Sequence, residues 1–161
     1  EEVVEFDINT ATKMIEAKER LIVDLSLKEK VTIEEFEELE KSFAKEFGQH
    51  AREILSMFIY SESDKGMESD MYIVQDTFYP TMFHKGITVT SAVVYKTYYE
   101  NEFFNQTLLR VREEYSGKDE KLKDWKREYV FKKNDNDEWE VYSFSGVMNF
   151  SLDAQYLEFK E

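Results

Sequence analysis

The polar hexamer KNDNDE at Lys133–Glu138 lies between two apolar stretches and concentrates the oxygen-bearing side chains that calcium prefers. A helix-loop-helix calcium loop needs such oxygens at alternate positions, a glycine at the sixth position and a glutamate at the twelfth. Counted from Asn134, the sixth position is Trp139, and counted from Asp135 the twelfth is Gly146. Both registers fail. Because Asn and Asp tolerate positive φ and bond their own backbone, the hexamer predicts a hairpin turn and no metal site.

A catalytic or metal site built on histidine is not favoured, because the chain holds only two histidines, His50 and His84, and no cysteine. A Ser/His/Asp triad needs a histidine between a nucleophile and an acid, and a multi-histidine metal site needs more ligands. His84 precedes Lys85 and Gly86 in an expected turn. We interpret it as a solvent-exposed turn residue and His50 as a capping or surface residue. We therefore predict no catalytic residue, no metal ligand and no cofactor.

Two arginines are the candidate ligand-binding residues. Arg110 and Arg112 flank Val111 on an expected strand, so alternation places both side chains on the same side as Leu108. Inside a cavity, paired guanidinium groups would bind a carboxylate or phosphate bidentately. The alternative is cross-strand pairing with the abundant Glu and Asp side chains.

Helices are expected over the first sixty residues. Apolar residues recur at spacings of three and four, and we expect helices on three stripes: Ile8, Ala11, Met14, Ile15, Lys18, Leu21 and Ile22; Ile33, Phe36, Leu39, Phe43 and Phe47; and Ala51, Ile54, Leu55 and Phe58. Thr32 and Glu35 form a capping-box pattern that opens the second helix, and Gly48 is its expected end.

Strands are expected over the remainder, because β-branched and aromatic residues alternate there. The expected segments are 71–83, an edge strand or bulge around Pro80; 87–99, with Ile87, Val89, Val93, Tyr95 and Tyr99 on a core face; 104–115; a strand with Trp125, Tyr129 and Phe131; and a last strand with Trp139, Val141 and Val147 opposite Tyr142, Phe144, Met148 and Phe150. A polar loop at 116–124 separates two of them. We expect Trp139 to be largely buried.

The composition excludes some partners. A net charge of -14 argues against nucleic acid and against an anionic membrane surface, since both need a positive field. No apolar run reaches the roughly 20 residues that span a bilayer. The chain begins with Glu1 rather than Met, so we expect a processed or trimmed protein. The absence of cysteine leaves the compartment open.

The order of elements predicts an α+β fold, with N-terminal helices packed on a curved antiparallel sheet in a single domain, 1–161. The helical part is expected at about 7–60 and the sheet part at about 71–150. Helices, a short hairpin and then long strands ending in YVFKKNDNDEWEVYSFSG resemble the nuclear transport factor 2-like (cystatin-like) superfamily. The resemblance implies a cone-shaped sheet around the helices, and many similar bacterial members are small exported or lipid-anchored proteins.

Enzymatic members of that superfamily, dehydratases and isomerases, place an Asp–His pair or a Tyr with an Asp inside the cone. No spacing in this chain shows such a pair, although Asp76, Tyr79, Tyr95 and Asp124 are available by type. The favoured hypothesis is a non-enzymatic ligand- or protein-binding accessory domain of an exported bacterial protein, secreted or lipid-anchored. Its partner would be a small apolar or anionic ligand or a protein, and a homodimer through the sheet is also open. A dehydratase- or isomerase-type enzyme is the alternative.

Overall fold

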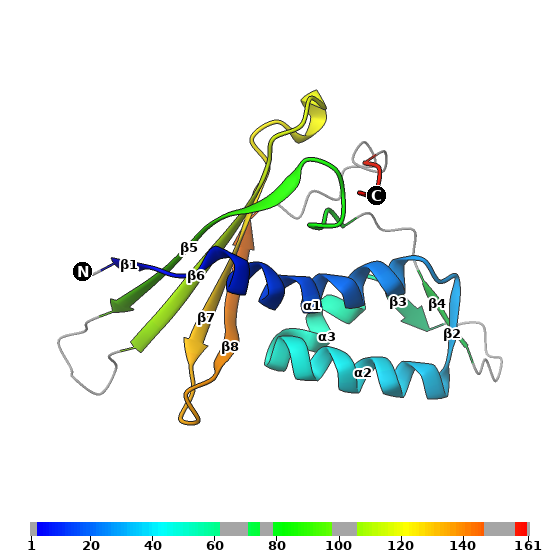
Figure 1. Cartoon of the computed structure of the whole chain (residues 1–161). Helices are drawn as coiled ribbons and strands as arrows, with labels where there is room; N and C mark the ends of the chain where they lie inside the picture. The colour runs from blue at the N-terminus through cyan, green and yellow to red at the C-terminus, as the bar shows by residue number, and fades with distance from the viewer. Residues whose placement is uncertain (1–2, 62–70, 75–78, 98–105, 147–156, 161) are drawn as a thin grey trace.

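The computed structural model describes residues 3–61, 71–74, 79–97, 106–146 and 157–160. Within them the fold is α+β, with helices packed on a curved antiparallel sheet that does not close into a barrel (Figure 1). The helices are α1 (Ile8–Ser26), α2 (Ile33–Phe47) and α3 (Ala51–Ser56), with short 3-10 turns η1 (Gly48–His50) and η4 (Glu120–Leu122).

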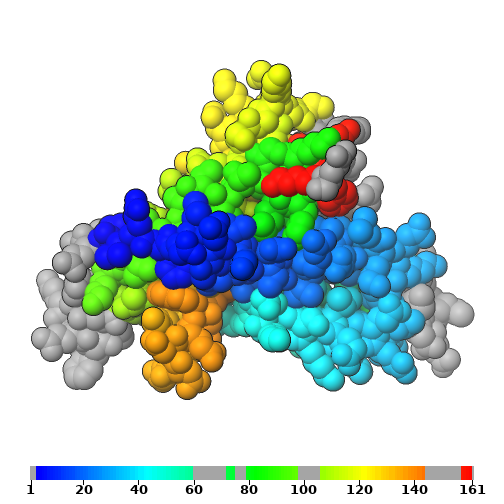
Figure 2. All heavy atoms as spheres, in the orientation of Figure 1, coloured from blue at the N-terminus to red at the C-terminus, as the bar shows by residue number. Residues whose placement is uncertain are grey.

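The described strands form two antiparallel sheets. The larger sheet has the order β1-β5-β6-β7-β8, and the smaller has the order β2-β4-β3. Their bounds are β1 (Val3–Glu5), β2 (Lys30–Thr32), β3 (Ile59–Ser61), β4 (Met71–Val74), β5 (Ile87–Thr97), β6 (Gln106–Tyr115), β7 (Lys126–Lys133) and β8 (Trp139–Gly146). The helices cover one face of the larger sheet, and α1 and α2 lie side by side on the surface of that layer (Figure 2).

Helix α1 begins at a polar cap and buries one stripe. The Oδ2 atom of Asp7 accepts a hydrogen bond from the Thr10 amide at 3.0 Å, which satisfies a donor that the first turn leaves free. Ala11, Ile15 and Ile22 are buried, as the spacing predicts, whereas the first member of the expected stripe, Ile8, is exposed.

Helix α2 has the predicted boundaries. The Thr32 hydroxyl accepts from the Glu35 amide at 3.1 Å, and the Glu35 carboxylate accepts from the Thr32 amide at 3.2 Å, so the capping box is confirmed. The helix ends at Gly48, whose φ of 56° is a conformation that favours glycine.

A β-bulge in β5 overturns the predicted core face of that strand. Val89 pairs with Glu113 and Ser91 pairs with Arg112, so Thr90 is an extra residue in the ladder. One extra residue reverses the alternation. Ala92 and Val94 therefore face the helices beyond the bulge, and the prediction that Val93 and Tyr95 do so is wrong. Tyr99 lies outside the described residues.

The segment around Pro80 also differs from the expectation. Strand β4 ends at Val74, and Tyr79–Thr81 form buried irregular chain rather than an edge strand. His84 lies in a turn, as predicted, but it is 5 % exposed, so its interpretation as a solvent-exposed residue is wrong. Phe159 forms an isolated bridge with His84.

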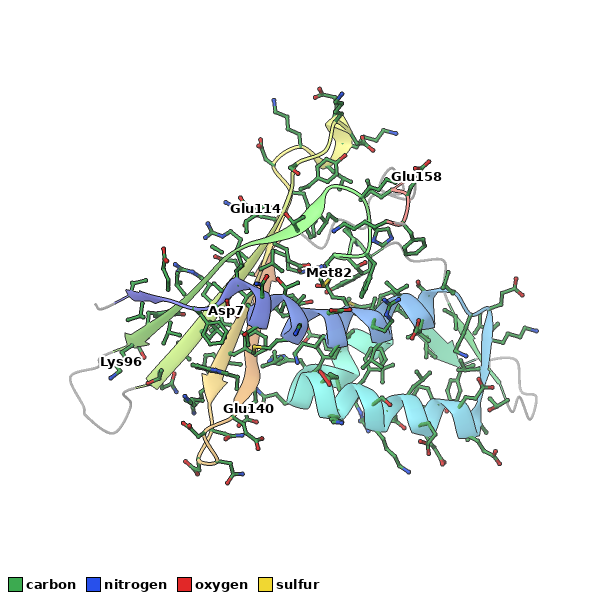
Figure 3. The ribbon with its side chains drawn as sticks, in the orientation of Figure 1. Asp7, Met82, Lys96, Glu114, Glu140 and Glu158 are labelled. Atoms are coloured by element: carbon green, nitrogen blue, oxygen red, sulfur yellow. The ribbon has the colours of Figure 1, made fainter. Side chains whose placement is uncertain are left out.

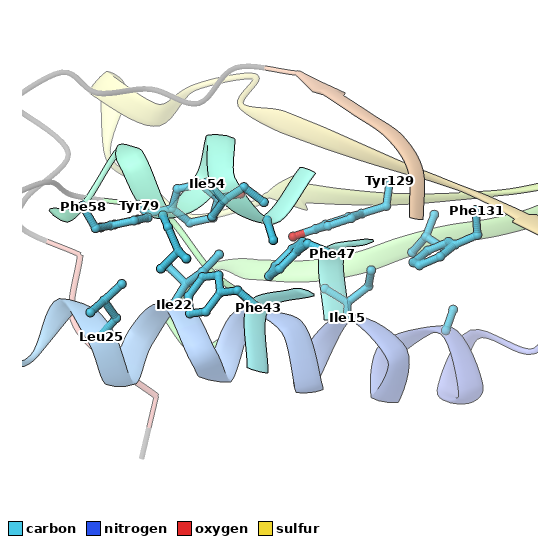
Figure 4. Close-up of a cluster of buried hydrophobic side chains, with 14 of the residues drawn as sticks. Ile15, Ile22, Leu25, Phe43, Phe47, Ile54, Phe58, Tyr79, Tyr129 and Phe131 are labelled. Atoms are coloured by element: carbon cyan, nitrogen blue, oxygen red, sulfur yellow. The ribbon is translucent and has the colours of Figure 1, made fainter. Parts of the chain in front are cut away.

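Aromatic rings fill the layer between the helices and the larger sheet. Phe43, Phe47, Tyr129 and Phe131 are almost fully buried in one cluster with the apolar face of α1 (Figure 4). Other members are Ile15, Ile22, Leu25, Ile54 and Phe58. The main core therefore lies between the helices and the face of the larger sheet that they cover, and it is closely packed.

The two tryptophans differ in burial, and Trp125 is the more buried of the two. Trp125 is 3 % exposed and packs with Ile87 and Leu122 in a second cluster. Trp139 is partly buried, packs on the main core and meets Phe6 edge-on, so it is less buried than Trp125. Its place near the end of the hairpin explains the difference, because fewer neighbours cover it there.

Candidate functional site

Acid–base side chains meet inside the fold, at a place that the sequence analysis missed. Glu19 of α1, Glu113 of β6 and Arg127 of β7 form a fully buried ion network, which with Tyr79 and Tyr129 is called the buried cluster below. The guanidinium donates from Nε to Glu113 Oε1 at 2.9 Å and from Nη2 to Glu19 Oε2 at 2.9 Å. A buried cation between two carboxylates joins the first helix to two neighbouring strands.

Glu19 is the most completely bonded member of the buried cluster. Its Oε2 atom also accepts from the Tyr129 hydroxyl at 2.8 Å, and its Oε1 atom accepts from the Met82 amide at 2.7 Å. Met82 lies just above α1 in Figure 3. Arg127 Nη2 donates in addition to the Pro80 carbonyl oxygen at 2.7 Å, so the irregular segment at 79–82 is bound to the same centre.

Burial decides the protonation states of the buried cluster. Removal from water raises the pKa of Glu113 well above its usual value, and the neighbouring Glu19 carboxylate adds to this against the opposing effect of Arg127. Burial also raises the pKa of Tyr129 and takes that of Tyr79 to about 12. For Arg127, burial lowers the pKa, but Glu113 and Glu19 together hold it well above its usual value. The raised pKa favours the protonated form of Glu113, and in that form the ion network carries no net charge.

The described chain leaves some polar atoms of the buried cluster without a partner. Arg127 Nη1, Glu113 Oε2 and the Tyr79 hydroxyl make no hydrogen bond to other described residues, nor does the Trp125 ring nitrogen. The guanidinium carbon lies 4.5 Å from the centre of the Tyr79 ring and 5.0 Å from that of Trp125, a cation–π arrangement. The chemistry of an acid–base site is therefore present, but the side chains of Glu19, Glu113 and Arg127 are 0 % exposed to a substrate.

The residues that the resemblance offered for catalysis are not brought together. Tyr79 belongs to the buried cluster, Tyr95 lies on the helix-free face of the sheet, and Asp124 is exposed in a loop with a φ of 63°. Asp76 lies outside the described residues. His84 is near the buried cluster, and burial lowers its pKa. Its Nδ1 atom accepts from the Thr81 amide at 3.0 Å, and that bond fixes the turn.

The candidate ligand-binding arginines lie on the opposite face of the sheet. Arg110 and Arg112 share the helix-free face with Leu108, as alternation predicts, and neither contacts the helical layer. Arg112 Nη2 is 2.6 Å from Glu128 Oε1, and Arg110 Nε is 3.8 Å from the same oxygen. The cross-strand pairing is confirmed, whereas ligand binding by these arginines stays a prediction.

The hexamer at 133–138 is a hairpin turn between β7 and β8, as predicted. Asn134 Oδ1 accepts from the amides of Asn136 and Glu138 at 2.9 and 3.0 Å, and Asp137 has a φ of 64°. The amide of Asn134 donates to the Glu138 carbonyl oxygen at 2.8 Å. His50 has a structural contact as well, because its Nε2 atom lies 2.9 Å from the Tyr142 carbonyl oxygen and connects η1 to β8.

An apolar groove opens on the surface between α2 and α3, called the α2–α3 groove below. It consists of a hollow of about 250 Å³ with walls of Phe36, Leu55, Ile59 and Tyr72, and of a more open hollow of about 570 Å³ lined in part by Ala44 and Gly48. Both hollows are lined by Glu40, Arg52 and Leu55, so they adjoin. The rings of Phe36 and Tyr72 are stacked with centres 4.3 Å apart, which gives the smaller hollow an aromatic wall.

Comparisons with protein-family models, with curated proteins and with solved structures give no match. No helix in the described part of the chain has both the length and the apolar character needed to cross a membrane.

Proposed function

We propose that this chain is a non-enzymatic binding or accessory domain that recognises a protein partner on its surface. The observation that carries the proposal is the state of the helical layer. Aromatic rings fill it, and the acid–base groups within it bond one another. A substrate site needs a concave, accessible pocket with a few free polar groups. Among the described residues, accessible hollows with apolar lining lie at the surface, as in the α2–α3 groove, rather than in the interior of the sheet.

The relation to the nuclear transport factor 2-like superfamily belongs to the same proposal, as does export from a bacterial cell. Helices packed on one face of a curved antiparallel sheet are in keeping with that superfamily. The support is one of architecture, and an architecture of this kind hosts both enzymes and binding proteins.

Two assays on the purified chain test the proposal. A thermal-shift screen against metabolites and lipids, followed by turnover assays with hydroxy and keto compounds, should give no catalysis. Selection from a displayed random-peptide library should give binding sequences. Turnover that is lost in Glu113→Gln, with the fold retained, would refute the proposal and favour the dehydratase or isomerase alternative. Glu128→Gln, on the helix-free face, is the matched control.

A further inference from the structure

We infer that the α2–α3 groove is the docking site for a basic, amphipathic peptide segment of the partner, an inference that rests on the proposed function. The apolar residues of the segment would enter the hollow walled by Phe36 and Tyr72. Its Lys or Arg residues would lie beside the glutamates of α2. This is helix-in-groove recognition, in which apolar anchors at i, i+3, i+4 and i+7 face the receptor.

The smaller hollow has the size of a single anchoring side chain, whereas the adjoining open hollow, at about 570 Å³, is within the range of small-molecule sites. The volume of the smaller hollow, about 250 Å³, lies below the range of about 300–1,000 Å³ that is usual for such sites. Leu55 and Ile59 are buried beneath it, so its floor is fixed by the core rather than by surface side chains. The neighbouring hollow continues the groove past Ala44, which is exposed. A polypeptide can place one anchor in the first hollow and extend through the second.

The charged side chains that line the groove, Glu37, Glu40, Lys41 and Arg52, balance one another, so the preference for a basic occupant comes from helix α2 as a whole. Helix α2 carries six Glu and two Lys residues, a balance of -4. Glu37 and Glu40 line the groove, while Lys41, on the same rim, lies 3.5 Å from Glu38 and is partly neutralised. The C-terminal end of α2, where Ala44 and Gly48 line the hollow, adds the negative end of a helix dipole, about half a charge. The net charge of -14 steers basic partners toward the whole molecule.

Arg52 is a positively charged residue on the rim of the groove, so its removal tests whether the charge of the rim affects peptide binding as inferred. It lines both hollows and is exposed, and it makes no ion pair with another described residue. A basic segment should therefore bind better without it. Arg52→Gln should strengthen binding and Glu40→Gln should weaken it, each by about two- to fivefold, as for exposed charge pairs.

Fluorescence anisotropy with labelled model peptides tests the inference at about 0.15 M salt, where distant charges are screened. The probe is a Leu/Lys peptide of about 14 residues, roughly four helical turns, with Leu at helical spacing. Two peptides serve as comparisons: the same Leu pattern with Glu in place of Lys, and a scrambled Leu/Lys peptide of the same charge. The patterned basic peptide should bind at least about tenfold more tightly than either comparison.

Matched substitutions locate the site without changing the charge. Ala44→Trp places a ring in the larger hollow, and Ser56→Trp places one at the rim of the smaller hollow. Each should weaken binding at least about tenfold. Ala17→Trp, at an exposed alanine of α1, should leave it unchanged. A circular-dichroism melt of each variant checks the fold, and two groove variants keep the test decisive if one of them unfolds.

Four results would overturn the inference. Equal binding of the scrambled peptide would mean attraction by net charge alone. Unchanged binding in both groove variants would place the peptide elsewhere and leave the proposed function standing. Self-association of the chain that Ala44→Trp abolishes would make a second copy the occupant. A lack of binding by any model peptide would remove a basic segment as the occupant, and catalytic turnover in the screen above would separately refute the proposed function.

Discussion

Replacing Arg127 with Met tests whether the buried cluster is a structural centre of the fold. The substitution removes a fully buried cation that donates to Glu113, to Glu19 and to the Pro80 carbonyl oxygen. Both carboxyl groups then remain in the interior without their cation. Breaking a buried ion network in this way costs about 3–5 kcal/mol of the free energy of unfolding. That is a large part of the roughly 5–15 kcal/mol that holds a typical domain folded.

Urea unfolding at two pH values measures this cost. With the guanidinium absent, the effect of Arg127 that lowers the pKa of Glu113 is lost, and protonation of Glu113 relieves part of the buried charge, so the destabilisation of Arg127→Met should be smaller near pH 5 than near pH 7.5. The control is Arg112→Met, on the adjacent strand and the opposite face. Its side chain is 35 % exposed and pairs with Glu128, so its loss should cost no more than about 1 kcal/mol.

The same reasoning predicts a rescue. The triple variant Arg127→Met, Glu19→Leu, Glu113→Leu leaves no buried charge, and it should recover part of the stability that the single variant loses, because the Met82 amide and the Tyr129 hydroxyl still lose their acceptor. Equal stability of Arg127→Met and Arg112→Met would refute the reasoning, because a buried cation cannot be removed from two carboxyls at no cost. So would a cost for Arg127→Met that does not change with pH. If the single variant fails to fold, the triple variant still decides between an ionic and a packing role.

Three further outcomes are expected. Because the folded-state pKa of Glu113 is raised, the folded protein holds this proton more tightly than the unfolded chain. Stability is therefore full below the ordinary Glu pKa and falls as pH rises through the raised pKa, by at most about 1.4 kcal/mol per pH unit. Glu113→Gln, which keeps an acceptor for the guanidinium and a donor toward Glu19, should flatten this dependence in pH-resolved urea titrations. The stability contribution of His84 changes with pH in the opposite direction, since burial lowers its folded-state pKa. Its contribution is present above the unfolded pKa of about 6.5 and is lost as pH falls from there through the lowered folded pKa. His84→Asn should remove this acid sensitivity, and an unchanged profile would contradict the assignment. Trp125→Ala should cost about 3–5 kcal/mol in chemical unfolding, and Trp139→Ala should cost less because that ring is only partly buried. The reverse order would contradict the packing described here.

The sequence was sufficient to predict the elements that are stabilised by interactions between near neighbours in the chain. The three helices, the capping box at Thr32 and the turn at 133–138 follow from side-chain spacing and from hydrogen bonds between near neighbours. The face of β5 could not be predicted in the same way. A bulge at Thr90 depends on how two strands align, and one extra residue reverses the face of every residue that follows.

The buried cluster could be predicted from the sequence only in part. Glu113 follows Leu109 and Val111 at alternate positions, and Arg127 precedes Tyr129 and Phe131 in the same way, so both charged residues stand where alternation predicts a core side chain. Such a position is rarely charged unless an opposite charge meets it. The sequence could have raised that question, but it could not say which charges meet, because the partners are 14 and 108 residues from Arg127 along the chain.

The position of the buried cluster explains why we place function on the surface. An apolar core of equal volume is often as stable as a buried ion network, so stability alone does not explain these charges. Glu19 accepts from the chain at Met82 and from two side chains of β7, and only one placement of α1 against the sheet satisfies all three donors. The network therefore specifies one arrangement of helix and sheet. Because the side chains of Glu19, Glu113 and Arg127 are 0 % exposed, we expect a ligand to find its polar contacts at the surface, where the rim of the α2–α3 groove offers Glu37, Glu40 and Arg52.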